Sequence, residues 1–127
     1  KVEGLTGKVT HLLLINGALH AAGLDGVYRV EGLKTTMVTA EPVRSIFVSP
    51  SLQQLIISTY NEEIKSYRQN GSNWVETHLL DTLNEYVSYM FEDKLQNLWL
   101  CGRASTWKVE MIDGQITNID QVNYLRP

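Results

Sequence analysis

The sequence has one cysteine, three prolines and no excess of basic residues, and these shortages exclude whole classes of protein. A single cysteine, Cys101, rules out an internal disulfide and a metal cage built from cysteines. Eleven basic residues against 14 acidic ones give a net charge of −3. A protein that neutralises a nucleic-acid backbone needs a clustered basic excess instead. Composition therefore argues against a disulfide scaffold and against a nucleic-acid-binding domain.

Long apolar stretches are also missing. The run from Leu12 to Ile15 is as long as any, far short of the roughly 20 residues that a membrane-spanning helix needs. The chain does not begin with methionine and shows no signal peptide, so we expect a mature or excised piece of a protein. The 127 residues are 43% hydrophobic and 20% charged, which is the balance of one globular domain with a core.

Turn signals and strand patterns divide the chain into short pieces. Asn or Asp precedes Gly between apolar runs at four places, and such pairs favour two-residue hairpin turns because both residues tolerate positive φ. These places are Asn16-Gly17, Asp25-Gly26, Asn70-Gly71 and Asp113-Gly114. Apolar and polar residues alternate over residues 74–79 and 107–111, as in half-buried strands. The short apolar runs at residues 12–15, 46–48 and 55–57 fit strands that are covered on both faces.

Four anchor residues recur three times along the chain, about every 40 residues and in the same order. Each repeat opens with a valine, continues with a leucine, places an aromatic residue in a third stretch and closes that stretch with a glycine. The anchors are Val9, Val43 and Val87; Leu19, Leu55 and Leu98; Tyr28, Tyr67 and Trp107; and Gly32, Gly71 and Gly114. Four strands in a unit of about 40 residues are typical of a β-propeller blade.

The repeat predicts an all-β fold of about three four-stranded β-propeller blades, as a fragment of a larger propeller. We expect the blades at residues 7–41, 42–85 and 86–127, with residues 1–6 as the end of a preceding blade. The alternative is an amphipathic helix over about residues 79–91, where the apolar residues also have helical spacing. We favour the strand because the stretch from Val87 onward aligns with two other strand stretches.

The third repeat carries a specific pattern: an apolar strand, an acidic pair, a polar turn, Leu-Trp-Leu, a glycine and a short aromatic strand. These positions are residues 87–91, Glu92-Asp93, Leu98-Trp99-Leu100, Gly102 and Trp107-Lys108-Val109. The pattern resembles the repeat of the two-component regulator propeller family. The first repeat matches in outline at Gly17, Leu19, Gly23, Gly26, Val27 and Tyr28, with His20 in place of the tryptophan. The second diverges most, with Ser49 near the acidic pair, Ile56 for the tryptophan and Thr59 for the glycine.

The resemblance implies a non-catalytic, ligand-sensing propeller segment on the extracytoplasmic, periplasmic side of a membrane-anchored two-component sensor. Many sensors of that family are hybrid histidine kinases that respond to glycan fragments. The implied partners are an oligosaccharide bound by the full ring, and either the remaining blades or a second copy. No kinase motif occurs in the sequence, and we expect no cofactor, no nucleic acid and no membrane insertion by this segment. The alternatives are a propeller scaffold for protein partners and a propeller glycoside hydrolase or lyase.

Single residues yield no catalytic or metal-binding set. Glu92 and Asp93 are neighbours on a strand, so their side chains point to opposite faces and could not flank one glycosidic bond. We expect Asp93 to accept backbone N–H bonds in the turn that follows. No metal-ligand spacing links Cys101 with any of the three histidines, His11, His20 and His78. Catalytic and metal-binding residues are therefore expected to be absent, and the ligand-binding residues stay open.

The large apolar residues predict packing and association. We expect Trp99 to pack between blades, Trp107 to lie in the core, and Trp74 to be the most exposed aromatic residue and the one a sugar could stack on. Cys101 fits a small buried apolar residue. Three blades cannot close a propeller ring, so the end blades should leave apolar faces bare, with residues such as Leu12, Leu14, Trp99 and Leu100 on them.

Overall fold

A computed structural model describes residues 9–71 and 73–123, and these residues form twelve strands. The expectation for residues 1–6 lies outside the described residues. No helix that could cross a membrane occurs in the described part of the chain. The strands are β1 (Val9–Ile15), β2 (Ala18–Gly23), β3 (Gly26–Glu31), β4 (Lys34–Thr39), β5 (Val43–Ser49), β6 (Gln54–Thr59), β7 (Ile64–Asn70), β8 (Asn73–Glu76), β9 (Val87–Glu92), β10 (Leu98–Gly102), β11 (Ser105–Ile112) and β12 (Gln115–Asn123).

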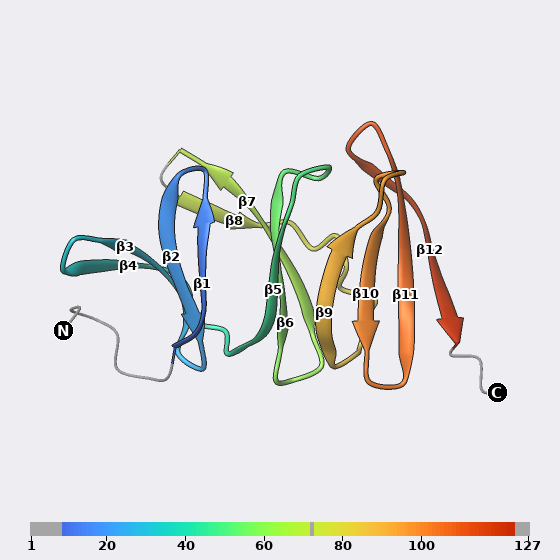
Figure 1. Cartoon of the computed structure of the whole chain (residues 1–127), viewed down its shortest axis with the longest axis horizontal. Coiled ribbons are helices and arrows are strands. Elements are labelled where there is room, and N and C mark those ends of the chain that lie inside the picture. The colour runs from blue at the N-terminus through green and yellow to red at the C-terminus, as the bar shows by residue number, and fades with distance from the viewer. Residues whose placement is uncertain (1–8, 72, 124–127) are drawn as a thin grey trace. The chain divides into compact units, whose positions relative to one another are not determined.

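The twelve strands form three antiparallel four-stranded sheets, each made of four consecutive strands (Figure 1). We call β1–β4 the first sheet, β5–β8 the second and β9–β12 the third. In each sheet the strands lie side by side in chain order, as expected when every connection is a short hairpin or turn. The expected all-β fold with three four-stranded units is therefore confirmed. The chain divides into two compact units, Lys1–Arg44 and Ser45–Pro127.

The second and third sheets share one hydrophobic core in the second unit. Ile56 and Ile64 of the second sheet lie in the same buried cluster as Leu98 and Leu100 of the third. Two hydrogen bonds tie the sheets together: the Ser45 hydroxyl donates to the Val87 carbonyl over 2.6 Å, and the Val87 N–H donates to the Ser58 hydroxyl over 3.1 Å. Apolar burial and these bonds hold the two sheets face to face.

The helical alternative for residues 79–91 is wrong. Residues 79–82 form turns, Asn84 makes an isolated bridge to Glu63, and β9 begins at Val87. Leu80 and Leu83, whose spacing helped to suggest a helix, are both buried in the core of the second unit. Irregular backbone and a strand therefore bury the apolar residues that suggested a helix.

Two of the expected hairpin turns lie where the Asx-Gly pairs predicted them. Asn16 and Gly17 have φ values of 50° and 82°, between the paired residues Ile15 and Ala18. Asp113 and Gly114, with φ values of 52° and 76°, form the corresponding turn between β11 and β12. Positive φ at both central residues is the signature of a type I′ turn, whose twist matches that of the flanking strands.

At the other two Asx-Gly pairs, the turn lies one residue away from its predicted position. Asn70 pairs with Asn73, so the β7–β8 turn begins at Gly71, which has a φ of 63°. Gly23 pairs with Gly26, so Asp25 belongs to the turn and Gly26 already belongs to β3. Gly26 has a φ of 114°, and a Cβ there would collide with the Thr39 carbonyl oxygen. Gly26 is thus required by the close approach of β4 and not by the turn.

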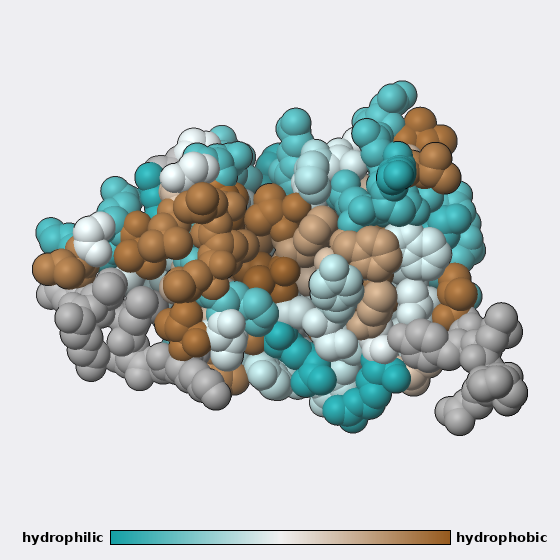
Figure 2. All heavy atoms as spheres, viewed as in Figure 1, coloured by the Kyte–Doolittle hydropathy of each residue, from teal (hydrophilic) through white to brown (hydrophobic). Residues whose placement is uncertain are grey.

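One face of the first sheet is apolar and exposed. This confirms the expectation that Leu12 and Leu14 lie on a bare face, and it corrects the expectation that residues 12–15 are covered on both faces. Leu55, Ile56 and Ile57 of the second sheet are fully buried, as expected, but Leu12 and Leu14 are each 69% exposed. Their side chains share one face of the sheet with Leu19, 41% exposed, and Met37, 57% exposed, because the pairing runs straight across the strands. We call these four residues the bare face. Figure 2 shows hydrophobic residues gathered over the region of β1 and β2.

Candidate functional site

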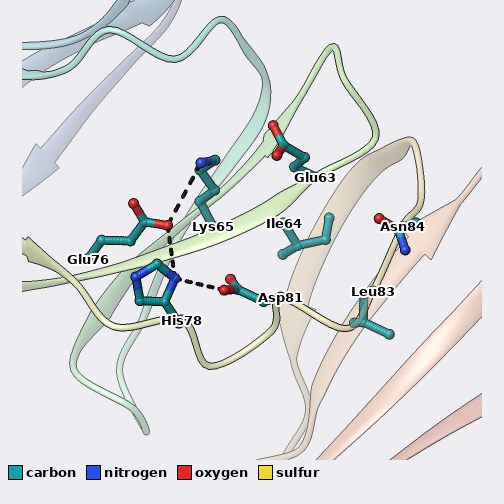
Figure 3. A pocket seen from close by; sticks show the side chains of 8 residues that line it. All are labelled: Glu63, Ile64, Lys65, Glu76, His78, Asp81, Leu83 and Asn84. Atoms are coloured by element: carbon teal, nitrogen blue, oxygen red, sulfur yellow. Dashed lines mark hydrogen bonds and ion pairs between the residues drawn. The ribbon is translucent and has the colours of Figure 1, made fainter.

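A pocket of about 220 Å³ lies in the second unit, where the β6–β7 turn approaches the segment that leads from β8 to β9. Its lining is mostly polar, with carboxylates, an amide, an imidazole and an ammonium group in one small space (Figure 3). The lining residues are Glu63, Ile64, Lys65, Glu76, His78, Asp81, Leu83 and Asn84. This lining can both donate and accept hydrogen bonds, and it is the candidate site.

Buried hydroxyl groups fix the backbone of one wall of the pocket. Ser66 of β7 is fully buried, its carbonyl accepts from the Thr77 N–H over 2.9 Å, and its hydroxyl accepts from the Leu79 N–H over 3.0 Å. The Thr77 hydroxyl also hydrogen-bonds the Ser66 hydroxyl over 2.8 Å. Both neighbours of His78 are therefore held against β7. Leu80, with no exposed surface, anchors the same segment in the core.

His78 is the centre of a charged cluster on that wall. Its Nδ1 lies 2.7 Å from Asp81 Oδ2 and 3.3 Å from Glu76 Oε2. Lys65 approaches the same Glu76 oxygen, with 3.8 Å between Nζ and Oε2. Figure 3 shows the three side chains of Glu76, His78 and Asp81 pointing toward one another. His78 has a φ of 58°, an uncommon conformation for a residue with a side chain, and it turns the ring toward both carboxylates.

The opposite wall is the β6–β7 turn. Glu63 bridges Asn84 through the backbone, and the Glu85 N–H donates to the Glu62 carbonyl over 3.2 Å. The Thr59 N–H closes the turn by donating to the Glu63 carbonyl over 2.9 Å. The turn and the segment before β9 therefore form one backbone-bonded rim, and this rim holds Glu63 and Asn84 at the pocket.

The acidic pair Glu92-Asp93 serves the turns, as expected for Asp93. The Asp93 carboxylate accepts from the N–H groups of Leu95 and Asn97, each over 2.9 Å, and from the Trp99 indole N–H over 2.9 Å. Glu92 accepts instead from the hydroxyl of Ser49 at the end of β5 and, over 2.7 Å, from that of Ser51 in the turn between β5 and β6. The two carboxylates hold two different loops, and neither is turned toward a shared substrate.

Hydrogen bonding also sets the charge state of Asp93. The indole N–H of Trp99 lowers the pKa of the Asp93 carboxyl most, and the backbone N–H of Asn97 lowers this pKa further. Donors stabilise the ionised form of a carboxyl group, so Asp93 stays charged well into the acid range. The structure therefore assigns Asp93 to turn stability.

The three tryptophans compare differently with their expected positions. Trp107 packs against the core of the second unit, as expected. Trp74 is only half-buried and Tyr89 is 62% exposed, so the prediction that Trp74 is the most exposed aromatic residue is wrong. Trp99 lies on the face of the third sheet that points away from the shared core, which agrees with its expected place on the outer face of an end blade. It stacks on Phe91 there, with ring centroids 6.3 Å apart.

Two further small predictions need correction. Leu100 was expected on a bare face, but it is fully buried in the core because it shares a sheet face with Leu98. Cys101 was expected to be buried, but it is half-buried because it alternates with Leu100 along β10 and so shares the outward face of Trp99.

The histidines occupy three different environments. His11 on β1 hydrogen-bonds the Thr10 hydroxyl over 2.9 Å. His20 on β2 is 1% exposed, and its Nδ1 lies 2.9 Å from the Ala18 carbonyl oxygen. Burial is the main cause that lowers the pKa of His20, and the Arg29 charge lowers this pKa as well. In the described part of the chain, only His78 joins two acidic side chains in a group of potential metal ligands.

The Glu76–His78–Asp81 cluster was not predicted, because the spacing of the histidines from one another and from Cys101 gives no sign of it. The spacing Glu-x-His-x-x-Asp is only weak evidence for a shared site. Glu76 and His78 are two residues apart, so their side chains point to the same side only if the chain is extended there. The cluster also requires that the chain turn back between His78 and Asp81, which follows from the burial of Leu80. No known family model matches this chain, and no curated protein matches it.

Proposed function

We propose that the chain is a non-catalytic, ligand-sensing segment of a β-propeller, in the extracytoplasmic part of a two-component sensor. Three consecutive four-stranded antiparallel sheets are the building units of such a propeller. The Leu-Trp-Leu strand with its preceding acidic pair, residues 92–100, supports the choice among propeller families. The use of Glu92 and Asp93 in turns supports a binding role over a glycoside hydrolase or lyase.

The observation that carries the propeller proposal is the bare face of the first sheet. Leu12 and Leu19 correspond in the repeat to Met90 and Leu98 of the third sheet. Met90 and Leu98 are 5% and 0% exposed because the second sheet covers them, whereas Leu12 and Leu19 are 69% and 41% exposed. The same face of the repeat is thus covered in one sheet and bare in another. A further blade that packs on the first sheet, from the same polypeptide or a second copy, supplies the missing cover.

The pocket supports a ligand rich in hydroxyl groups. Carboxylates such as Glu63 accept hydrogen bonds from hydroxyls, while the Asn84 amide and the Lys65 ammonium donate them. A glycan fragment has both kinds of partner and fits this lining. The rim belongs to the junction of two sheets only, and a propeller ligand gathers contacts from several such junctions. The isolated chain should therefore bind an oligosaccharide too weakly to measure.

A propeller scaffold for protein partners remains the second candidate. A scaffold and a sensor both present loops on a rigid ring, so the fold alone does not separate them. The coding sequence on either side of this segment separates the two candidates. A membrane span and a histidine kinase downstream support the sensor, and a secretion-associated domain supports the scaffold.

Titration calorimetry tests the ligand-sensing proposal directly. Oligosaccharides are titrated into the isolated chain and into the larger propeller that we propose contains it. We expect saturable binding by the larger propeller, weakened by Glu63→Gln and unchanged by Glu62→Gln, a matched change beside the pocket. Tight binding by the isolated chain would contradict the partial ring. No binding by the larger propeller, or equal effects of the two substitutions, would contradict ligand sensing at this pocket.

A further inference from the structure

We infer that Glu76, His78 and Asp81 form a binding site for a divalent cation of the zinc class. An imidazole nitrogen and two carboxylate oxygens, all within 4.8 Å of one another, form this set of possible ligand atoms. The imidazole nitrogen distinguishes the site from an ordinary acidic patch. Mixed nitrogen and oxygen ligands suit Zn²⁺, whereas Mg²⁺ and Ca²⁺ prefer oxygen alone. The inference goes beyond the proposed function and does not depend on it.

The distances fit a single four-coordinate ion. Zinc bonds histidine nitrogen and carboxylate oxygen at about 2.0–2.2 Å, so neighbouring ligand atoms of a tetrahedral site lie about 3.3 Å apart. The His78 nitrogen lies 3.3 Å from the Glu76 oxygen, which matches this separation without adjustment. It lies 2.7 Å from the Asp81 oxygen, and a small rotation of the exposed Asp81 side chain lengthens this distance. Three protein ligands leave a fourth position for water or a ligand group in the pocket.

The backbone that carries the three side chains is fixed before any ion arrives. Thr77 and Leu79, on either side of His78, are hydrogen-bonded to the buried Ser66. Glu76 ends β8, and Leu80 holds the turn that leads to Asp81 in the core. A metal ion therefore needs to order three side chains only, and a preorganised site binds more tightly than a flexible one.

The charges around the site also favour a cation. Two carboxylates face the position between them, and the Lys65 ammonium group lies 3.8 Å from Glu76 Oε2. Lys65 contacts the Glu76 oxygen that faces His78, so binding of an ion moves the ammonium group to the other Glu76 oxygen. There it orients the carboxylate from outside the coordination sphere, as groups beside metal ligands commonly do.

Titration of the whole chain with zinc chloride near neutral pH, followed by calorimetry, tests the site. We expect one equivalent of zinc to bind, and magnesium chloride to give at least tenfold weaker binding. His78→Gln and Asp81→Asn should each weaken zinc binding by about tenfold or more. His11→Gln is the matched control because His11 is also incompletely buried and lies on β1, in the other unit. Circular dichroism of each variant checks that the sheets are intact.

Each outcome decides the proposal. Loss of zinc binding in folded His78→Gln and Asp81→Asn, with the His11→Gln protein unchanged, supports it. A native chain that binds no zinc overturns it, and the cluster is then an ion pair only. Zinc binding that survives both substitutions, or disappears in the His11→Gln protein, also overturns it. Because this experiment contains no oligosaccharide, its failure leaves the proposed glycan-sensing role unaffected.

Discussion

Asp93 shows how one side chain can define a whole connection between strands. Its carboxylate accepts hydrogen bonds from two backbone N–H groups of the β9–β10 turn and from the Trp99 indole N–H. These bonds fix the turn and the tryptophan together. The pattern Glu-Asp followed by Leu-Trp in the third repeat thus has a local structural cause. A short polar residue in the turn is the natural acceptor for groups that no strand partner satisfies.

Asp93→Ala should lower the melting temperature of the chain. The substitution leaves the Leu95 and Asn97 N–H groups and the indole N–H without their acceptor, so water has to replace it. Asp93→Asn keeps one acceptor oxygen and should lie between the Ala variant and the native chain. Thermal denaturation followed by circular dichroism measures the effect. An Ala variant that melts with the native chain would show that water satisfies these donors equally well.

His20 makes the stability of the first unit depend on pH. Burial lowers its pKa below the ordinary value of 6.5, so the unfolded chain takes up a proton more readily than the folded one. Stability should be highest above pH 6.5 and fall as the pH decreases from 6.5 toward the lowered pKa. The contribution of Asp93 changes in a separate window, because its lowered pKa lies below 3.8.

Urea unfolding at about pH 7 and about pH 5 measures this dependence. We expect the urea midpoint of the native chain to fall toward pH 5, and a folded His20→Gln variant to lose part of that fall. A His11→Gln variant serves as the control, since His11 is only partly buried. If the native chain and the His20→Gln variant showed the same pH dependence, the burial of His20 could not be its cause.

At the scale of elements, the hydroxyl network of Ser66 and Thr77 replaces a regular strand pair. β8 ends at Glu76, and the backbone beyond it would leave β7 if nothing held it. The Ser66 hydroxyl contacts the Leu79 N–H and the Thr77 hydroxyl, so the departing segment stays bonded to the sheet. The position of His78 and Asp81 at the pocket follows from this attachment.

Ser66→Ala should destabilise the chain by about 1–3 kcal/mol, because it removes a buried hydroxyl and leaves the Leu79 N–H without its partner. Ser88→Ala is the matched control. Ser88 is exposed, its single described hydrogen bond is 3.4 Å long, and its removal should cost no more than about 0.5 kcal/mol. Urea unfolding monitored by tryptophan fluorescence gives both values. Equal effects of the two substitutions would contradict a special role for the Ser66 network.

Much of the element structure was predictable from local sequence, and the reasons for the failures are physical. Alternation over residues 107–111 and the pairs Asn16-Gly17 and Asp113-Gly114 are local signals, and they predicted strands and turns correctly. The apolar run at residues 12–15 wrongly predicted cover on both faces, because an apolar run does not show whether a second sheet is present. The number of blades, by contrast, correctly predicted that Leu12 and Leu14 are exposed. The pocket was missed because it depends on contacts between the β6–β7 turn and the segment before β9.

At the scale of the whole molecule, apolar sheet faces that need cover determine how the chain behaves in water. The bare face of the first sheet holds Leu12, Leu14, Leu19 and Met37. Full burial of one such side chain contributes about 1.5–3 kcal/mol, so covering four of them favours association appreciably. The outward face of the third sheet adds a stacked pair, Phe91 and Trp99. A chain with two such faces should not remain alone in water at high concentration.

Sedimentation velocity at micromolar concentrations tests this central claim most directly. We expect the chain to associate as its concentration rises, and the double substitution Leu12→Lys with Leu14→Lys to shift it toward the monomer. Leu95→Lys is the control, because Leu95 is 79% exposed and lies in the β9–β10 turn, in the other unit. A folded native chain that sediments strictly as a monomer over the whole concentration range would contradict the account. Association that the double substitution leaves unchanged would contradict it as well.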